Sequence, residues 1–127
     1  MKSLFRIQLL FIIIVTTAIG QNFTSKHFRT EKLSDGVYAA IHSFGGYAIC
    51  NSGIVDLGDE VLVFDTFLTV EAAKDLLKAA ESLTNKPVTY VINSHAHNDH
   101  IRGNQVFHPN SVIISTNNIR EQIKKDE

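Results

Sequence analysis

The chain has 127 residues, the length of about one domain, and 44% of them are hydrophobic while 20% are charged. This composition is typical of a globular protein and excludes a largely disordered chain. The formal net charge of -1 at pH 7 argues against a general nucleic-acid binder, since such proteins normally carry a basic excess. The single cysteine excludes an intramolecular disulfide and a cysteine-based zinc ribbon.

Residues 1–20 predict a secretory signal peptide. A short basic start over residues 1–6 precedes an unbroken apolar run over residues 9–15, and small residues follow at 18–20. A membrane anchor is the alternative interpretation, but the apolar stretch is shorter than the roughly 20 residues that cross a bilayer. We therefore expect export to a secreted or periplasmic location, with no stable membrane anchor after cleavage.

Residues 21–32 are polar and mixed in character, and they predict a linker. Turn pairs such as Asp35-Gly36 then separate three short apolar segments, which are typical of strands in an antiparallel meander. These predicted strands are residues 37–41, 47–57 and 61–64, and Asp65 follows the last of them. Cys50 lies within the second segment, where we expect it to be a small buried hydrophobe. In an exported protein its thiol could form a disulfide only with another chain.

A helical pattern follows the meander. Thr69 can cap this helix, Glu71 lies in its first turn, and apolar residues over 72–83 recur on one face. The tripeptide Asn-Lys-Pro at 85–87 ends it. Further along the chain we expect a strand over 88–92, a loop with a short turn of helix, a strand over 112–114, and a last helix capped by Asn117 or Asn118. This order of strands and helices predicts a layered α/β fold.

The segment after the strand at 88–92 carries the candidate chemistry. Four potential metal ligands occur within six residues, namely His95, His97, Asp99 and His100. In an extended chain the first three project to one side, and His100 follows where the chain turns into a helix. Imidazole and carboxylate are zinc ligands, and α/β sheets bind ligands at the carboxyl ends of their strands. A polar surface loop with incidental histidines is the alternative.

The sequence His95-Ala96-His97-Asn98-Asp99-His100 resembles the HxHxDH signature of the metallo-β-lactamase superfamily. The order of elements around the signature is similar to that family over roughly residues 33–116. The resemblance implies an αββα sandwich of two similar halves, of which residues 33–127 are the N-terminal half of an apparently truncated domain. Half a sandwich would leave one sheet face bare, which predicts a missing C-terminal half or a homodimer.

The resemblance also implies two zinc ions in the complete protein. His95 and His97 match ligands of the first ion, and Asp99 and His100 match ligands of the second. Asp99 would in addition act as the catalytic residue that orients the attacking water. Asp65 would orient the metal-bound imidazoles without itself binding metal, although a solvated strand end is the alternative for this residue. The family's remaining ligands belong to the second half.

As a function, the resemblance implies an exported zinc-dependent hydrolase for a small-molecule substrate. Metal-bound hydroxide would attack the carbonyl of an ester, a thioester, or an amide such as a β-lactam. One alternative is an inactive metal-binding fragment or module that needs a second chain to complete its site. Another is an exported domain whose histidines are incidental. We expect His108 to be a loop residue, and we assign no role to His27 or His42.

Overall fold

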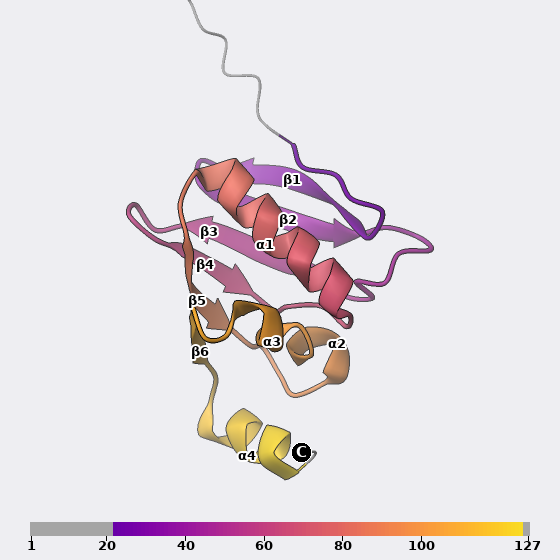
Figure 1. Cartoon of the computed structure of the whole chain (residues 1–127), viewed down its shortest axis with the longest axis vertical. Coiled ribbons are helices and arrows are strands. Elements are labelled where there is room, and N and C mark those ends of the chain that lie inside the picture. Colours follow the sequence, from indigo (N-terminus) through magenta and orange to yellow (C-terminus); the bar gives the residue numbers. More distant parts are fainter. Residues whose placement is uncertain (1–21, 126–127) are drawn as a thin grey trace, which may run out of the picture.

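The structure is a computed structural model, and it describes residues 22–125. The predicted signal peptide lies outside these residues. Six strands form one sheet in the order in which they occur along the chain (Figure 1). They are β1 (Phe28–Ser34), β2 (Val37–His42), β3 (Ser52–Asp56), β4 (Val61–Phe64), β5 (Val88–Ile92) and β6 (Val112–Ile114). The pairs from β1 to β4 are antiparallel, and β4, β5 and β6 are parallel. The predicted α/β fold and its meander are therefore confirmed.

Helix α1 (Val70–Thr84) connects the parallel strands β4 and β5 and covers one face of the sheet (Figure 1). It begins as the sequence predicts, because the Thr69 hydroxyl accepts a hydrogen bond from the amide of Ala72 at 3.3 Å. It ends at Asn85, whose φ of 56° is the left-handed conformation that terminates helices. Alanine, valine and leucine side chains fill the space between α1 and the sheet, and most of them have no exposed surface.

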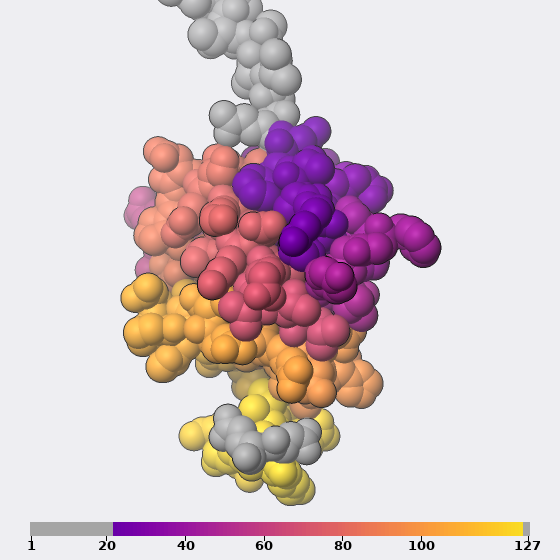
Figure 2. Space-filling model, turned by 45° about the vertical axis from the view of Figure 1, so that its right-hand side comes forward, coloured from indigo at the N-terminus to yellow at the C-terminus, as the bar shows by residue number. Residues whose placement is uncertain are grey.

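The shorter helices lie toward the carboxyl ends of the parallel strands. Helices α2 (Asn98–Ile101) and α3 (Asn104–Phe107) follow β5, and α4 (Asn117–Lys125) follows β6. Figure 2 shows α4 standing apart from the rest of the molecule at one end. Its cap is Thr116 and not the expected Asn117 or Asn118, because the Thr116 hydroxyl accepts from the amide of Ile119 at 3.3 Å. Within residues 22–125, none of the helices is both long and apolar enough to cross a membrane.

The sheet face opposite α1 carries a continuous set of apolar side chains, which we call the open face. Cross-strand pairing places these residues on one side of the sheet, and Phe64, Val112 and Ile114 are 42%, 57% and 41% exposed. The open face consists of Val37, Ala39, Val55, Leu62, Phe64, Tyr90, Ile92, Val112 and Ile114. This is the bare face expected of half a sandwich.

Two sequence-based predictions need correction. The linker predicted over residues 21–32 is wrong for its last part, because β1 begins at Phe28. This edge strand buries only Phe28 and Thr30, so its sequence lacks a long apolar alternation. The strand predicted over 47–57 is also shorter, because β3 begins only at Ser52. Residues 43–51 form a loop, which we call the Cys50 loop, and Ile49 within it has a φ of 71° that no strand accommodates.

Candidate metal centre

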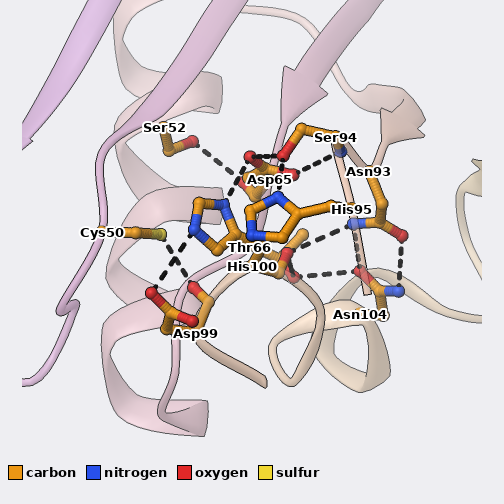
Figure 3. Close-up of polar contacts among 10 residues, drawn as sticks. All are labelled: Cys50, Ser52, Asp65, Thr66, Asn93, Ser94, His95, Asp99, His100 and Asn104. Atoms are coloured by element: carbon orange, nitrogen blue, oxygen red, sulfur yellow. Dashed lines mark hydrogen bonds and ion pairs between the residues drawn. The ribbon is translucent and has the colours of Figure 1, made fainter. Parts of the chain in front are cut away.

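Three loops meet at one edge of the sheet. Asp65 directly follows β4 and Asn93 directly follows β5, and these strands are parallel, so both residues leave the sheet at the same edge. Strand β3 runs antiparallel to β4, so the residues that precede Ser52 arrive at this edge as well. The candidate site is therefore built from the Cys50 loop, the residues after β4, and the segment 93–104 (Figure 3).

Asp65 is the buried centre of the site, with 3% of its surface exposed. Its carboxylate accepts hydrogen bonds from the Ser94 amide at 2.8 Å, from the Ser94 hydroxyl at 2.7 Å, and from Nδ1 of His100 at 2.7 Å. Its own amide donates to the Ile92 carbonyl at 2.9 Å, and its carbonyl accepts from the Ser52 hydroxyl. A solvated strand end would have none of this burial, so the structure disfavours that alternative for Asp65.

These contacts set the protonation pattern of two histidines. A carboxylate only accepts hydrogen bonds, so Nδ1 of His100 must carry the proton, and Nε2 is then the nitrogen with the lone pair. The Ser94 hydroxyl donates to Asp65, and its oxygen lies 2.8 Å from Nδ1 of His95, so that nitrogen is also the donor. Asp65 thereby sets the tautomer of His100 through a direct hydrogen bond and that of His95 through the Ser94 hydroxyl. Both rings present Nε2 as the ligand atom.

Three donor groups converge in front of Asp65. The group consists of one ligand atom from each of Cys50, Asp99 and His100, and these atoms lie within 4.8 Å of one another. The described part of the chain contains no other group of three or more such ligand atoms. Nε2 of His100 is 3.4 Å from a carboxylate oxygen of Asp99. The Cys50 thiol donates to the main-chain carbonyl of Asp99 at 2.7 Å, as Figure 3 shows. The structure thus brings together two of the four predicted ligands and adds a cysteine.

The other two predicted ligands lie beside this group. The ring of His95 has its centroid 4.0 Å from that of His100 and 4.6 Å from that of His97. His97 is exposed and directly precedes α2. The expectation that Asp99 would extend in line with these two histidines is wrong, because α2 already begins at Asn98. The early helix directs Asp99 toward His100 and Cys50.

A network of side-chain amides fixes the helical end of this segment. The Asn104 amide donates to Asn93 at 2.8 Å, and Asn93 donates to the carbonyl of His100 at 3.2 Å. The amide of Thr66 also donates to that carbonyl, at 2.9 Å. Gly103 is required at its position, because a Cβ there would overlap the carbonyl oxygen of Thr66. The side chain of the preceding residue, Arg102, is exposed to solvent, so it does not interfere with this packing.

Sequence reasoning missed Cys50 because it placed this residue inside a strand. The thiol is half-buried in a loop, and burial, together with the nearby carboxylates of Asp99 and Asp65, raises its pKa to about 12. A signal for its position was present. Counting back from the turn at Gly58 in an antiparallel hairpin sets Ser52 opposite Asp65, which brings Cys50 to the same edge.

The remaining histidines lie outside the donor group. His108 is an exposed residue at the end of α3, as predicted. His27 is 1% exposed, and its Nδ1 accepts from the amide of Tyr47 at 3.1 Å. Nδ1 of His42 accepts from the amide of Ile49 at 3.2 Å. His27 and His42 therefore hold the Cys50 loop, a role that the sequence did not indicate.

The donor set fits zinc. Imidazole nitrogen, carboxylate oxygen and thiolate sulfur are the three ligand types that this ion binds in proteins. The rings of His95 and His100 are oriented by hydrogen bonds at Nδ1, the nitrogen that faces away from the ligand atom, as is usual for a metal-binding imidazole. His95 and His97 would form one set of donors, and Asp99 and His100, with Cys50 beside them, a second.

Comparison with known proteins gives a family for this arrangement. A family model described as the metallo-beta-lactamase superfamily matches residues 45–115, more than half of the chain. The matched stretch includes Cys50, Asp65 and the whole segment 93–104.

Solved structures match over most of the chain at low sequence identity. A metallo-beta-lactamase from Hirschia baltica is 22% identical with a TM-score of 0.69, and the match covers 80% of this chain and 48% of that one. One from Erythrobacter litoralis, with beta-mercaptoethanol in its active site, is 21% identical with a TM-score of 0.70, covering 84% and 49%. The enzyme FIM-1 from Pseudomonas aeruginosa, in a mono-zinc form, is 17% identical with a TM-score of 0.69, covering 79% and 46%. The chain thus spans about half the length of these proteins.

Proposed function

The chain belongs to the metallo-beta-lactamase superfamily, and from this premise we propose that it carries the metal-binding half of an exported zinc-dependent hydrolase. The substrate would be a small molecule with an ester, thioester or amide carbonyl, a β-lactam among them. The observation that carries the proposal is the pair of imidazoles of His95 and His100, both oriented through Asp65, with Nε2 of His100 presented to Asp99.

Each side chain has a definite task in this proposal. His95 and His97 would hold one zinc ion, and Asp99 and His100 would hold a second. Zinc at these positions would polarise the substrate carbonyl and lower the pKa of the attacking water. Asp99 would orient that water, since its carboxylate lies beside Nε2 of His100 and is partly exposed to solvent. Asp65 would keep the imidazoles in the tautomer that binds metal.

We propose that turnover requires more protein than residues 22–125. The matched structures are about twice as long, and the open face exposes apolar side chains such as Phe64 and Val112. We propose that the remaining half of the domain covers this face in the active form and supplies the missing ligands and most of the substrate contacts. A second copy of the chain is the alternative source of that cover.

The second candidate function is an inactive metal-binding module. It is favoured by the same half-length match, because zinc could bind here while the groups that position a substrate are missing. Export rests on the basic, apolar and small-residue order of residues 1–20. Expression in a bacterial host, followed by mass determination of the chain in the periplasm or medium, tests cleavage after this segment.

Hydrolysis assays separate the two candidates. The full chain would be incubated with a chromogenic ester and with a chromogenic cephalosporin, with zinc and with a chelator present. Thiol reductants should be omitted, because beta-mercaptoethanol occupies the active site of one structural relative. Chelator-sensitive turnover that disappears in His97→Ala, but not in His108→Ala, supports the hydrolase. Zinc binding without turnover supports the module.

Zinc binding itself is tested by thermal unfolding. A ligand that binds only the folded chain raises its melting temperature, and saturation at about 100 times Kd stabilises it by about 2.7 kcal/mol. An unchanged melting temperature of a folded chain at millimolar zinc would contradict both candidates. The alternative that would then remain is an exported domain whose histidines bind no metal.

A further inference from the structure

We propose that Cys50 is a metal ligand, and that it completes with Asp99 and His100 a three-donor site contained entirely in this half of the fold. The inference rests on the metal binding proposed above, but not on hydrolytic activity. Neither the family signature nor the sequence pattern assigned a function to this cysteine. What assigns one is the convergence of its sulfur with two ligand atoms from a segment 49 residues away.

The spacing of the three donors suits one ion. Tetrahedral zinc with bonds of about 2.0–2.3 Å separates its ligand atoms by roughly 3.3–3.8 Å. The ligand atoms of Cys50, Asp99 and His100 lie within 4.8 Å of one another, and the pair from Asp99 and His100 is 3.4 Å apart. The largest of these separations therefore exceeds the tetrahedral range by no more than about an ångström.

The Cys50 loop is held in place before any ion binds. Ala48 is buried, and its carbonyl accepts from the amide of Leu68 at 3.1 Å. Asn51 accepts from the amide of His42 at 3.0 Å, on the other side of the cysteine. Gly46 packs so tightly on His27 that a Cβ atom added to Gly46 would lie 2.7 Å from the Cα atom of His27. Because the loop is anchored on both sides of Cys50, the position of the Cys50 thiol is restricted.

The charges also balance. Binding breaks the sulfur–hydrogen bond of Cys50, releases the proton to the buffer, and forms a sulfur–metal bond with the thiolate electron pair. The thiolate and the Asp99 carboxylate then supply two negative charges, which neutralise a divalent cation, while His100 stays neutral. Thiolate also favours soft and borderline ions, so this site should take zinc, cobalt or cadmium and reject magnesium and calcium.

Cobalt substitution gives a direct test, because Cys50 is the only cysteine in the sequence. The full chain would be prepared with a phosphine reductant and titrated with cobalt(II) in a spectrophotometer. We expect a thiolate-to-cobalt charge-transfer band in the near ultraviolet. Cys50→Ser should abolish this band and weaken cobalt binding at least tenfold. His108→Ala is the matched control, since it removes an exposed histidine outside the donor group and should leave the band in place.

A second measurement needs no variant. Saturating zinc should slow the reaction of the wild-type thiol with an aromatic disulfide reagent at least tenfold, and chelation should restore the rate.

Cobalt binding with no charge-transfer band and no protection of the thiol would overturn the assignment of Cys50 while leaving the proposed zinc sites intact. A band whose molar absorptivity per chain rises with chain concentration at saturating cobalt would also overturn it, because the thiolate would then bind a metal shared between two chains. No cobalt or zinc binding at all would refute the proposed function too.

Discussion

Replacing Asp65 with asparagine tests how the site selects its histidine tautomers. The amide oxygen can still accept from the Ser94 amide, but the new NH₂ group takes the place of the oxygen that faces the Ser94 hydroxyl and Nδ1 of His100, each at 2.7 Å. An NH₂ group only donates, so Nδ1 of His100 must become the acceptor, and its proton moves to Nε2. The Ser94 hydroxyl is then free to donate to His95, which switches in the same sense.

The expected loss is large because one substitution misdirects two ligands. Removing a group that orients a metal-binding imidazole typically costs 10- to 100-fold in metal affinity. With His95 and His100 both switched, we expect the upper end, about 100-fold or ~2.7 kcal/mol. The side chain keeps its size and stays buried, so the fold should survive the change.

Competition with a chromophoric zinc chelator measures this loss, and nitrogen NMR of the imidazoles reports the tautomers. Asp56→Asn is the matched control, since it removes a carboxylate from the same sheet that binds Lys86 and not the site. The reasoning is refuted if Asp65→Asn binds zinc within threefold of the control, or if the protons of both rings stay on Nδ1.

Three further predictions address the fold around the site. Gly103→Ala should destabilise the chain by about 3 kcal/mol in denaturant unfolding, because its methyl group overlaps the carbonyl of Thr66 and overpacking of this kind typically costs 1–3 kcal/mol. The hydrogen bond from Lys86 holds the pKa of Asp56 below its ordinary 3.8, so the pair stabilises the fold above that pH and the effect is lost as the pH falls through the lowered pKa. Lys86→Gln should therefore lower the melting temperature slightly at about pH 7, since the pair is only partly buried, and this difference should shrink as the pH falls below 3.8. Val112→Lys should reduce self-association in sedimentation experiments, because it places a charge on the open face, where the native side chain is 57% exposed.

The sequence was sufficient for most of the fold because local signals agreed with the tertiary structure. Thr69 is a good helix cap with apolar helical spacing behind it, and the structure uses it as one. Strands β4 and β5 are short apolar runs bounded by turn residues, and each buries two valine side chains. Strand β1 escaped prediction since an edge strand needs only one buried side, and Phe28 and Thr30 suffice for that.

The site was predictable only where its residues are adjacent in the chain. His95, His97, Asp99 and His100 fall within one short segment, so their pattern is visible without a structure. Cys50 joins them through the pairing of β3 with β4, a contact that depends on hairpin register and not on any motif. Such an isolated cysteine in an apolar stretch is indistinguishable from a core residue until the loop around it is known.

The position of the site suggests that metal binding and turnover can be separated in this protein. All candidate ligands come from the edge formed by β3, β4 and β5, and their supporting hydrogen bonds run to Asp65 and Asn93 within that edge. The apolar residues of the open face contribute to none of these contacts. In the proposed hydrolase, a cover on the open face would therefore stabilise the sheet and contact the substrate, but it would not be needed to arrange Asp99, His100 and Cys50. Loss of that cover should reduce hydrolysis far more than it reduces affinity for zinc at these three residues.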